Sequence, residues 1–170
     1  ENLTLRYNMR NSFTDVTSLA QGLVLNNYNS IQFGEPELQN ALSHNVSLFY
    51  SSFNLFNYTN VFAGANYSKN IDQIRSFTTF ESVIRTSTFF NSQFADESAS
   101  VFGRVQRTFG KIRASIRANF NYSLNNQFIQ ERQSVVNESF TQSYTPELRT
   151  NFREAPNVRL RYSYTVRNND

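Results

Sequence analysis

The chain has 170 residues, of which 15% are aromatic and 17% charged, and its formal net charge is +3. The absence of cysteine excludes a disulfide scaffold and a thiolate metal site. No run of about 18 apolar residues occurs, which excludes a transmembrane helix. The arginines are spread singly along the chain, opposite the aromatic residues of alternating stretches, so the basic balance does not indicate nucleic-acid binding.

Alternation of apolar and polar side chains predicts seven long strands, because successive residues of an extended chain point to opposite faces. The first predicted strand begins at residue 2, with Leu3 and Leu5 on one face and Thr4 on the other. The predicted strands lie near residues 2–12, 43–54, 57–70, 97–109, 111–125, 138–153 and 156–168. The second and third of these are imperfect, because Phe49 and Phe62 interrupt the alternation.

The longest regular alternation is IRASIRANFNYSLN at 112–125, with Ile112 and Ile116 on one face and Arg113 and Arg117 on the other. Ordinary strands have about 5–6 residues. At about 3.3 Å per residue, this segment extends roughly 46 Å. Tilted by about 40°, it rises about 35 Å, which is enough to cross the ~25 Å apolar band of an outer-membrane barrel. Its length therefore favours a membrane-crossing strand over a strand of a soluble sheet.

The connections between the predicted strands alternate between short and long. Short turns are expected around 54–57, 109–111 and 153–157, and long loops at 13–42, 71–96 and 126–137. The segment IRTSTFF at 84–90 has the composition of one strand of a hairpin within such a loop. Strict alternation of this kind is typical of an antiparallel up-and-down barrel with tight turns at one membrane face. The predicted fold class is therefore an all-β transmembrane β-barrel.

Aromatic residues gather near the ends of the predicted strands, where a barrel places its two interfacial girdles. Those expected at the short turns are Phe53, Phe56, Phe109 and Phe152, and those expected toward the other interface are Tyr122 and Tyr164. The chain has no tryptophan, so tyrosine and phenylalanine would supply both girdles.

No enzyme signature is present, and neither a catalytic residue, a metal site nor a cofactor is expected. The only histidine, His44, stands at the start of a predicted strand without a second histidine or a cysteine to complete a metal site. A catalytic triad would also have to use His44, and no Gly-x-Ser-x-Gly motif accompanies it. We expect a binding or transport function instead.

Two groups of residues are the candidates for a binding role. Arginines on the polar face would line the lumen of a barrel, where they would satisfy neighbouring carboxylates and water or attract anions. These lumen candidates are Arg6, Arg104, Arg113, Arg117, Arg149, Arg159 and Arg161. In the first long loop, the ligand-contact candidates are Asn26, Asn27, Tyr28 and Asn29.

The stretch from 13 to 54 resembles a segment of the TonB-dependent outer-membrane receptors of Bacteroidota. In that family an ascending strand and an external loop lead to a Gly-Asn-Pro-x-Leu-x-Pro-Glu signature before a descending strand. Gly34, Pro36 and Leu38 match the signature, whereas Glu35 replaces its Asn and residues 39–41 replace its Pro-Glu end. The segments NYSKNIDQI and NFNYSLNNQF are similar in style to the same group.

The resemblance implies a barrel of about 22 strands with an N-terminal plug, gated by periplasmic TonB and importing a siderophore, glycan or peptide. It also implies that the 13–42 loop is extracellular and that the short turns are periplasmic. Seven strands cannot close such a barrel, and open edges in lipid would leave backbone groups unpaired. Residues 1–170 are therefore expected to be part of one barrel domain whose plug and remaining strands lie outside this sequence.

Two other interpretations remain open. One is a non-transporting barrel subunit of a larger outer-membrane assembly or secretion complex, with protein or lipoprotein partners. If the chain is not a segment of a longer polypeptide, several chains would each contribute strands to one barrel. A soluble secreted β-sheet adhesin would instead be monodisperse in plain buffer, although its apolar face would then lie in water. The partners expected for the importer are membrane lipid, the plug and TonB, and no nucleic acid.

Overall fold

The computed structural model describes residues 1–20, 22–81, 84–129 and 133–169. The protein is all-β, with 74% of its residues in strands and 3% in helix. The strands form two sheets, one of eight strands and one of four. No helix within these described ranges is long and apolar enough to cross a membrane.

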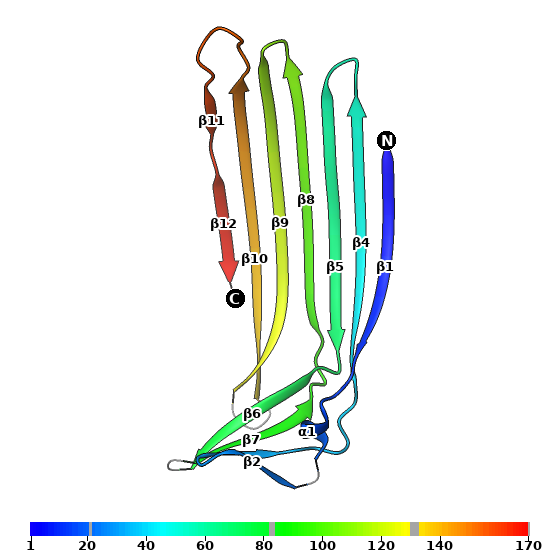
Figure 1. Ribbon diagram of the computed structural model, residues 1–170, viewed down its shortest axis with the longest axis vertical. Helices are drawn as coiled ribbons and strands as arrows, with labels where there is room; N and C mark the ends of the chain where they lie inside the picture. Colours follow the sequence, from blue (N-terminus) through cyan, green and yellow to red (C-terminus); the bar gives the residue numbers. More distant parts are fainter. Residues whose placement is uncertain (21, 82–83, 130–132, 170) are drawn as a thin grey trace.

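The eight-stranded sheet, called here the main sheet, is a meander in which every neighbouring pair of strands is antiparallel. Its strands are β1 (Asn2–Ser12), β4 (Ala41–Asn54), β5 (Thr59–Ile71), β8 (Asp96–Phe109), β9 (Ile112–Ile129), β10 (Gln133–Thr150), β11 (Arg159–Arg161) and β12 (Tyr164–Asn169). They pair in this order, except that β11 and β12 both pair with β10. The sheet is open: β1 forms one edge, β11 and β12 form the other, and the two edges lie on opposite sides of the molecule (Figure 1).

The four-stranded sheet, called here the loop sheet, is built from two long excursions of the chain. The first contains α1 (Val16–Leu19), β2 (Leu23–Asn27) and β3 (Ser30–Phe33), and the second contains β6 (Ile74–Glu81) and β7 (Ile84–Asn91). The strand order is β2-β3-β7-β6, and the central β3–β7 pair is parallel. The loop sheet lies at one end of the main sheet, and the short turns lie at the other (Figure 1).

The short turns at the opposite end have clear local causes. In the two-residue β8–β9 turn, Gly110 has a φ of +58° at the first turn position, where a type II′ hairpin requires a positive φ. In the β4–β5 turn, the side-chain Oδ1 of Asn54 accepts hydrogen bonds from the backbone N–H of Phe56 and Asn57, at 2.9 and 3.3 Å. Such side-chain acceptors reproduce the bonding of a backbone turn. We call this end of the main sheet the short-turn end.

The main sheet has no hydrophobic core. Among the described residues no hydrophobic side chain is buried, and the only buried polar side chains are those of Ser18, Ser92, Asp96 and Asn126. A soluble domain buries one face of each sheet against a second layer. In this molecule many large apolar side chains are exposed, among them Leu3, Leu5, Leu160 and Tyr162.

Two of the four buried polar groups, Asp96 and Asn126, belong to the contact that joins the two sheets. Asp96, at the start of β8, forms an ion pair with the guanidinium of Arg75 on β6. The carboxylate of Asp96 also accepts a hydrogen bond from the backbone N–H of Asn126 on β9, at 2.9 Å. Ser92, a third buried residue, instead donates its backbone N–H to the carbonyl of Gln73 within the second excursion, at 2.8 Å. The Arg75–Asp96 ion pair, together with the Asn126 bond to the same carboxylate, is called here the junction, because the ion pair links the loop sheet to the end of the main sheet.

The first six predicted strands are confirmed to within about five residues, but the seventh strand and two of the predicted connections need correction. The segment 13–42 is not simply a loop, because it contains α1, β2 and β3. No long loop occupies 126–137: β9 continues to Ile129 and β10 begins at Gln133, while residues 130–132 lie outside the described residues. The last predicted strand is broken into β11 and β12. The hairpin expected around 84–90 is confirmed as β6–β7.

Candidate functional site: an arginine-lined depression

The main sheet has one polar and one apolar face. Residues directly opposite each other in a sheet share a face, and the register pairs Arg104 with Arg117 and Val105 with Ile116. The polar face carries mostly Ser, Asn, Thr and Arg, and the apolar face mostly Val, Ile, Leu, Ala and Tyr. The alternation predicted from the sequence is therefore confirmed across all the long strands.

The apolar face is bounded by polar groups at the loop-sheet end. One cross-strand row there consists of Met9, His44, Lys69, Glu97, Leu124 and Glu138. Within it, the Nζ of Lys69 lies 2.9 Å from Oε1 of Glu97. The next row toward the short turns consists of Tyr7, Val46, Tyr67, Ala99, Tyr122 and Phe140. A charged row is thus followed immediately by a row with a tyrosine on every second strand.

At the short-turn end the apolar face is bounded by Arg107, whose guanidinium lies 4.8 Å from the ring centroid of Phe109. Ten residues separate Glu97 from Arg107 along β8, and the apolar-face positions between them are Ala99, Val101, Gly103 and Val105. At about 3.3 Å per residue this separation is about 33 Å along the strand. For a strand tilted by about 40° it corresponds to about 25 Å of height.

The aromatic residues expected near the two ends of the strands lie only partly where the sequence predicted them. Tyr122 belongs to the tyrosine row and Phe109 to the short-turn end, as expected. Phe53 is instead on the polar face, because it lies opposite Asn60. Tyr164 pairs with Tyr144, which pairs with Ala118, so it lies two rows inside the tyrosine row. Phe53 differs because the odd-numbered positions of β4 from Ser43 onward lie on the polar face. Tyr164 differs because the strand is broken before β12.

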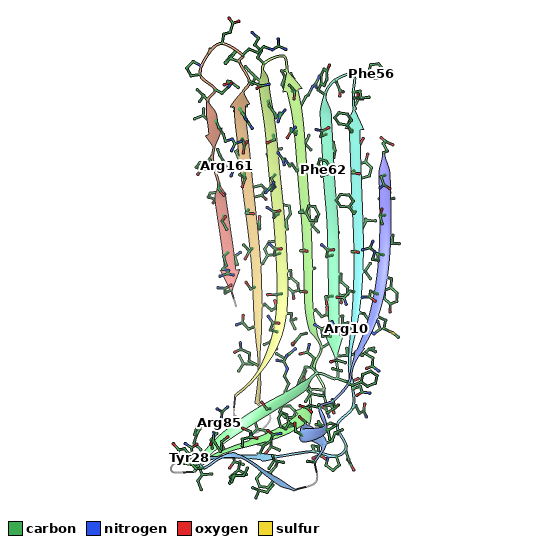
Figure 2. The ribbon with its side chains drawn as sticks, viewed as in Figure 1. Arg10, Tyr28, Phe56, Phe62, Arg85 and Arg161 are labelled. Carbon is green, nitrogen blue, oxygen red and sulfur yellow. The ribbon has the colours of Figure 1, made fainter. Side chains whose placement is uncertain are left out.

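Six of the seven lumen candidates line one depression of about 460 Å³ on the polar face near the short-turn end. They come from four strands, and they are Arg104, Arg113, Arg117, Arg149, Arg159 and Arg161. Gln106, Ser115, Thr145, Glu147 and Ser163 complete the lining. Arg6 is not part of it, because it lies on the edge strand β1 opposite Ser47. Figure 2 shows Arg161 and Phe62 toward the short-turn end and Arg10 at the other end of the sheet.

Among the described residues that line the depression, one carries a carboxylate. Glu147 on β10 is directly opposite Arg161, whose Nη2 and Nε lie 2.6 and 2.8 Å from Oε2 of the glutamate. The Nε of Arg159 lies 3.4 Å from the other oxygen, Oε1. Two of the six arginines are therefore paired with one glutamate.

Among the described residues, none of the other four arginines forms an ion pair within 4 Å of a carboxylate, although the charge of Arg104 also acts on Glu147. They form two like-charged pairs, with Arg104 directly opposite Arg117 and Arg113 directly opposite Arg149. Arg104 donates from Nη2 to Oε1 of Gln106 at 2.9 Å, which is a neutral acceptor. Like charges directly opposite in a sheet repel each other. The depression is thus a concentrated positive region.

An aromatic patch adjoins this positive region on the same face. Phe49, Gly64 and Phe102 lie in one row across β4, β5 and β8, and Phe62 lies directly opposite Arg104. With Phe53 the patch has four phenylalanines, of which Phe49, Phe53 and Phe62 are 39%, 57% and 42% exposed. The two phenylalanines that interrupt the alternation in the sequence, Phe49 and Phe62, therefore both belong to the polar face.

The loop candidates are together at the far tip of the loop sheet, far from the depression (Figure 2). Asn26 and Asn27 end β2, and Tyr28 in the β2–β3 turn is 93% exposed. Two of the amide side chains form local hydrogen bonds. Nδ2 of Asn26 donates to Oε1 of Gln32, and Oδ1 of Asn27 accepts from the backbone N–H of Asn29. With two of the three amides bonded locally, the almost fully exposed Tyr28 is the candidate that is most clearly available to a ligand.

The remaining chemistry is sparse. No group of three or more His, Asp or Glu side chains in the described part of the chain is placed to hold a metal ion. His44 lies on the apolar face, where its Nδ1 is 2.7 Å from the hydroxyl of Tyr7 and the two rings stack at 6.1 Å. This histidine contributes to the loop-end boundary of the apolar face, not to a site on the polar face.

Sequence reasoning identified the arginines but missed the way in which they gather. Alternation gives the face of each side chain, whereas the pairing register decides which side chains on that face become neighbours. The missed signal was that β8, β9 and β10 follow one another in the chain as antiparallel neighbours, so arginines at the same distance from the turns become neighbours.

The chain matches no family model, no curated protein sequence and no solved structure.

Proposed function

We propose that this chain is part of the wall of an integral outer-membrane β-barrel that belongs to a TonB-dependent importer. In this proposal the apolar face contacts lipid and the polar face lines the lumen. The observation that carries it is the apolar face itself, which is bounded by Glu97 and Arg107 at a separation that corresponds to about 25 Å of height. That height equals the apolar band of outer-membrane barrels.

The absence of a buried hydrophobic residue in the described ranges supports this assignment. A single-layer sheet in water would leave one entire face of Val, Ile, Leu and Tyr without a cover, at a cost of about 25 cal/mol for each Å² of apolar surface. Lipid covers such a face directly. The tyrosine row next to the charged row also suits the boundary between hydrocarbon and head groups.

The open edges of the main sheet support a larger barrel. β1 and the β11–β12 edge each present a row of backbone groups on their outer sides. In hydrocarbon each unpaired backbone group costs several kcal/mol, so only a closed sheet is stable there. Further strands must therefore pair with both edges, from the same polypeptide or from other chains.

The importer part of the proposal rests on the resemblance around Gly34, Pro36 and Leu38 and on the polar, arginine-rich face. The activity would be binding and gated passage of a scarce nutrient, such as a siderophore, a glycan or a peptide, without catalysis. The loop sheet would face the outside of the cell, where Tyr28 is available to contact a ligand, and the short turns would face the periplasm.

The membrane assignment is tested with two matched variants, Ala118→Arg and Asn119→Arg. These neighbours on β9 point to opposite faces, and Ala118 lies near the middle of the apolar band. An arginine facing lipid near the midplane costs about 2–4 kcal/mol. We expect Ala118→Arg to reduce assembly into the outer membrane about tenfold or more, and Asn119→Arg to leave it almost unchanged. Assembly is measured as the folded, heat-modifiable fraction in purified outer membranes.

Equal assembly of the two variants would overturn the assigned faces. Recovery of the native protein as a monodisperse species in buffer without detergent would overturn the membrane assignment altogether. The importer is tested separately by the mass and sequence of the intact polypeptide extracted from its native membrane. A mass several times 19.7 kDa, with a plug and a TonB box, supports an importer; a mass near 19.7 kDa contradicts it.

A further inference from the structure

We infer that Arg104, Arg113, Arg117 and Arg149 form a binding site for a small ligand that carries two or more anionic oxygen groups, either phosphates or carboxylates. The inference deepens the proposed function and rests on it in one respect, which is that the polar face lines the lumen. The four arginines lie on β8, β9 and β10, so the site is built entirely on long strands of the main sheet and not on loops.

The charge arrangement is the first argument. Arg104 faces Arg117 across one strand pair and Arg113 faces Arg149 across the next, and no carboxylate among the described residues lies within 4 Å of their guanidinium groups. Two adjacent like-charged pairs weaken the sheet that carries them. A bound anion reverses this effect, because a guanidinium binds carboxylate or phosphate oxygens through two parallel N–H donors.

The spacing of the two pairs indicates how many anionic groups the ligand has. Arg113 and Arg117 are four residues apart on β9, which places their backbones about 13 Å apart. Arg113 belongs to one pair and Arg117 to the other, with Ser115 between them on the same face. Because an arginine side chain is long, guanidinium groups from both pairs can converge on one compact ligand that carries two anionic groups, which is therefore favoured over a single small ion.

Glu147 shows that a carboxylate fits among these guanidinium groups. It lies opposite Ser115, in the row between the two arginine pairs, and Arg161 binds its Oε2 through both Nη2 and Nε. Arg159 and Arg161 are thereby occupied, while Arg113, Arg117 and Arg149 remain exposed. Glu147 thus binds Arg159 and Arg161. The pairs Arg104–Arg117 and Arg113–Arg149 are left for a ligand.

The size of the depression favours a small molecule over an acidic protein segment. Its volume of about 460 Å³ lies within the range of roughly 300–1,000 Å³ that is typical of small-molecule sites. Hydroxyl groups of Ser115, Thr145 and Ser163 line it beside the arginines and offer further hydrogen bonds to anionic oxygens. An acidic peptide is the competing occupant, and the experiment below separates the two.

The test is calorimetric titration of the full-length protein, purified in a non-ionic detergent at about 0.1 M salt, with pyrophosphate, citrate and inorganic phosphate. We expect saturable binding of pyrophosphate or citrate, about tenfold tighter than binding of inorganic phosphate. The stronger of the two probes then identifies phosphate or carboxylate as the preferred group. The double variant Arg113→Gln/Arg149→Gln should weaken this binding about tenfold or more.

The matched control is Arg6→Gln/Arg10→Gln, which removes the same charge from the same face but at β1. We expect it to change the affinity by no more than about twofold, because these charges lie beyond a Debye length of the site at moderate salt. Heat-modifiable migration in gels verifies that both double variants are folded. Equal weakening in the two double variants would show a diffuse field instead of a site.

Three results would overturn the inference. They are the absence of saturable binding by both polyanions, inorganic phosphate binding as tightly as pyrophosphate and citrate, and a glutamate-rich peptide binding more tightly than either. The failure of this inference is distinguishable from that of the proposed function. A protein that assembles in the membrane but binds no polyanion contradicts only the inference, whereas a water-soluble protein that binds pyrophosphate contradicts only the membrane assignment.

Discussion

A single glycine determines how the aromatic patch packs on the polar face. Gly64 lies on β5 between Phe49 and Phe102 in the register, and the Phe102 ring covers it. A Cβ added at Gly64 would lie 2.4 Å from Cζ of Phe102, which is far closer than van der Waals contact. The glycine is therefore required for the close approach of the ring and not for any special backbone conformation.

We expect Gly64→Ala to destabilise the folded protein by about 1–3 kcal/mol, because the Phe102 ring must leave its position to accommodate the methyl group. The measurement is the urea concentration at which heat-modifiable migration is lost. The control is Gly103→Ala on the neighbouring strand β8, where an added Cβ meets nothing within 4 Å. Equal stability of the two variants would show that Phe102 does not rest on Gly64.

The candidate site was predictable at the level of residue type and face but not of position. Alternation assigns Arg113 and Arg117 to the polar face without any knowledge of their neighbours. The sequence does not reveal that Arg149 lies opposite Arg113, because that contact depends on the register between two strands joined at the far end by residues 130–132. Arg6 satisfies the same sequence criterion and yet lies outside the depression.

At the scale of the elements, long strands were predictable and short ones were not. β1 runs from Asn2 to Ser12, as its alternation indicates, because eleven residues give a clear period. β2 and β3 have five and four residues, too few for a period to emerge. Their sheet also depends on a parallel contact between β3 and β7, which lie more than fifty residues apart in the sequence. No local pattern encodes such a contact.

The break between β11 and β12 also has a physical cause that lies on another strand. Pro146 on β10 accepts a hydrogen bond from the backbone N–H of Tyr162 but has no N–H to return. In an antiparallel ladder both backbone groups of a residue face the same neighbour, so the missing bond falls between Arg161 and Tyr164. β11 ends and β12 begins at those residues. The alternation of the last strand alone predicts an unbroken element.

The junction between the two sheets yields a prediction at this scale. Asp96→Asn removes the charge that binds the guanidinium of Arg75 and leaves that cation without a carboxylate partner among the described residues. Hydrogen bonds to charged groups contribute about 1.5–3 kcal/mol when partly buried. We expect proteolytic cleavage within 72–95 of the native protein to become about tenfold faster or more, because cleavage follows the opening equilibrium.

Glu97→Gln is the matched control, because it makes the same chemical change at the next residue. Its partner Lys69 is more exposed, and the pair joins β5 and β8 within the main sheet without bridging to the loop sheet. Exposed ion pairs contribute little to stability. We expect the cleavage rate of this variant to resemble that of the native protein. Similar acceleration in both variants would show that the junction does not hold the loop sheet.

At the scale of the whole molecule, the two ends of the main sheet differ in what they expose. The short-turn end carries Phe56, which is 99% exposed, and the loop sheet carries Tyr28, which is 93% exposed (Figure 2). In the proposed barrel these two residues lie on opposite sides of the outer membrane. The 170 residues contain no cysteine, so a single introduced thiol in this region can be followed.

We expect Tyr28→Cys to react with a membrane-impermeant maleimide on intact cells, and Phe56→Cys to react only after the outer membrane has been permeabilised. The physical reason is that a charged reagent does not cross the bilayer, whereas both side chains are accessible to water. Labelling is read by mass spectrometry of the extracted protein. The opposite pattern would invert the orientation, and labelling of both on intact cells would contradict a membrane-spanning sheet.

The parallel β3–β7 pair has a consequence for how this protein can diverge. It binds residues 30–33 to residues 85–88, so the two excursions share one hydrogen-bonded sheet although they are separate in the sequence. An insertion in either excursion that shifts its strand would disrupt the other. The two segments are therefore expected to be inherited and exchanged as a unit, and relatives should show paired changes in their lengths while the turns at the opposite end vary independently.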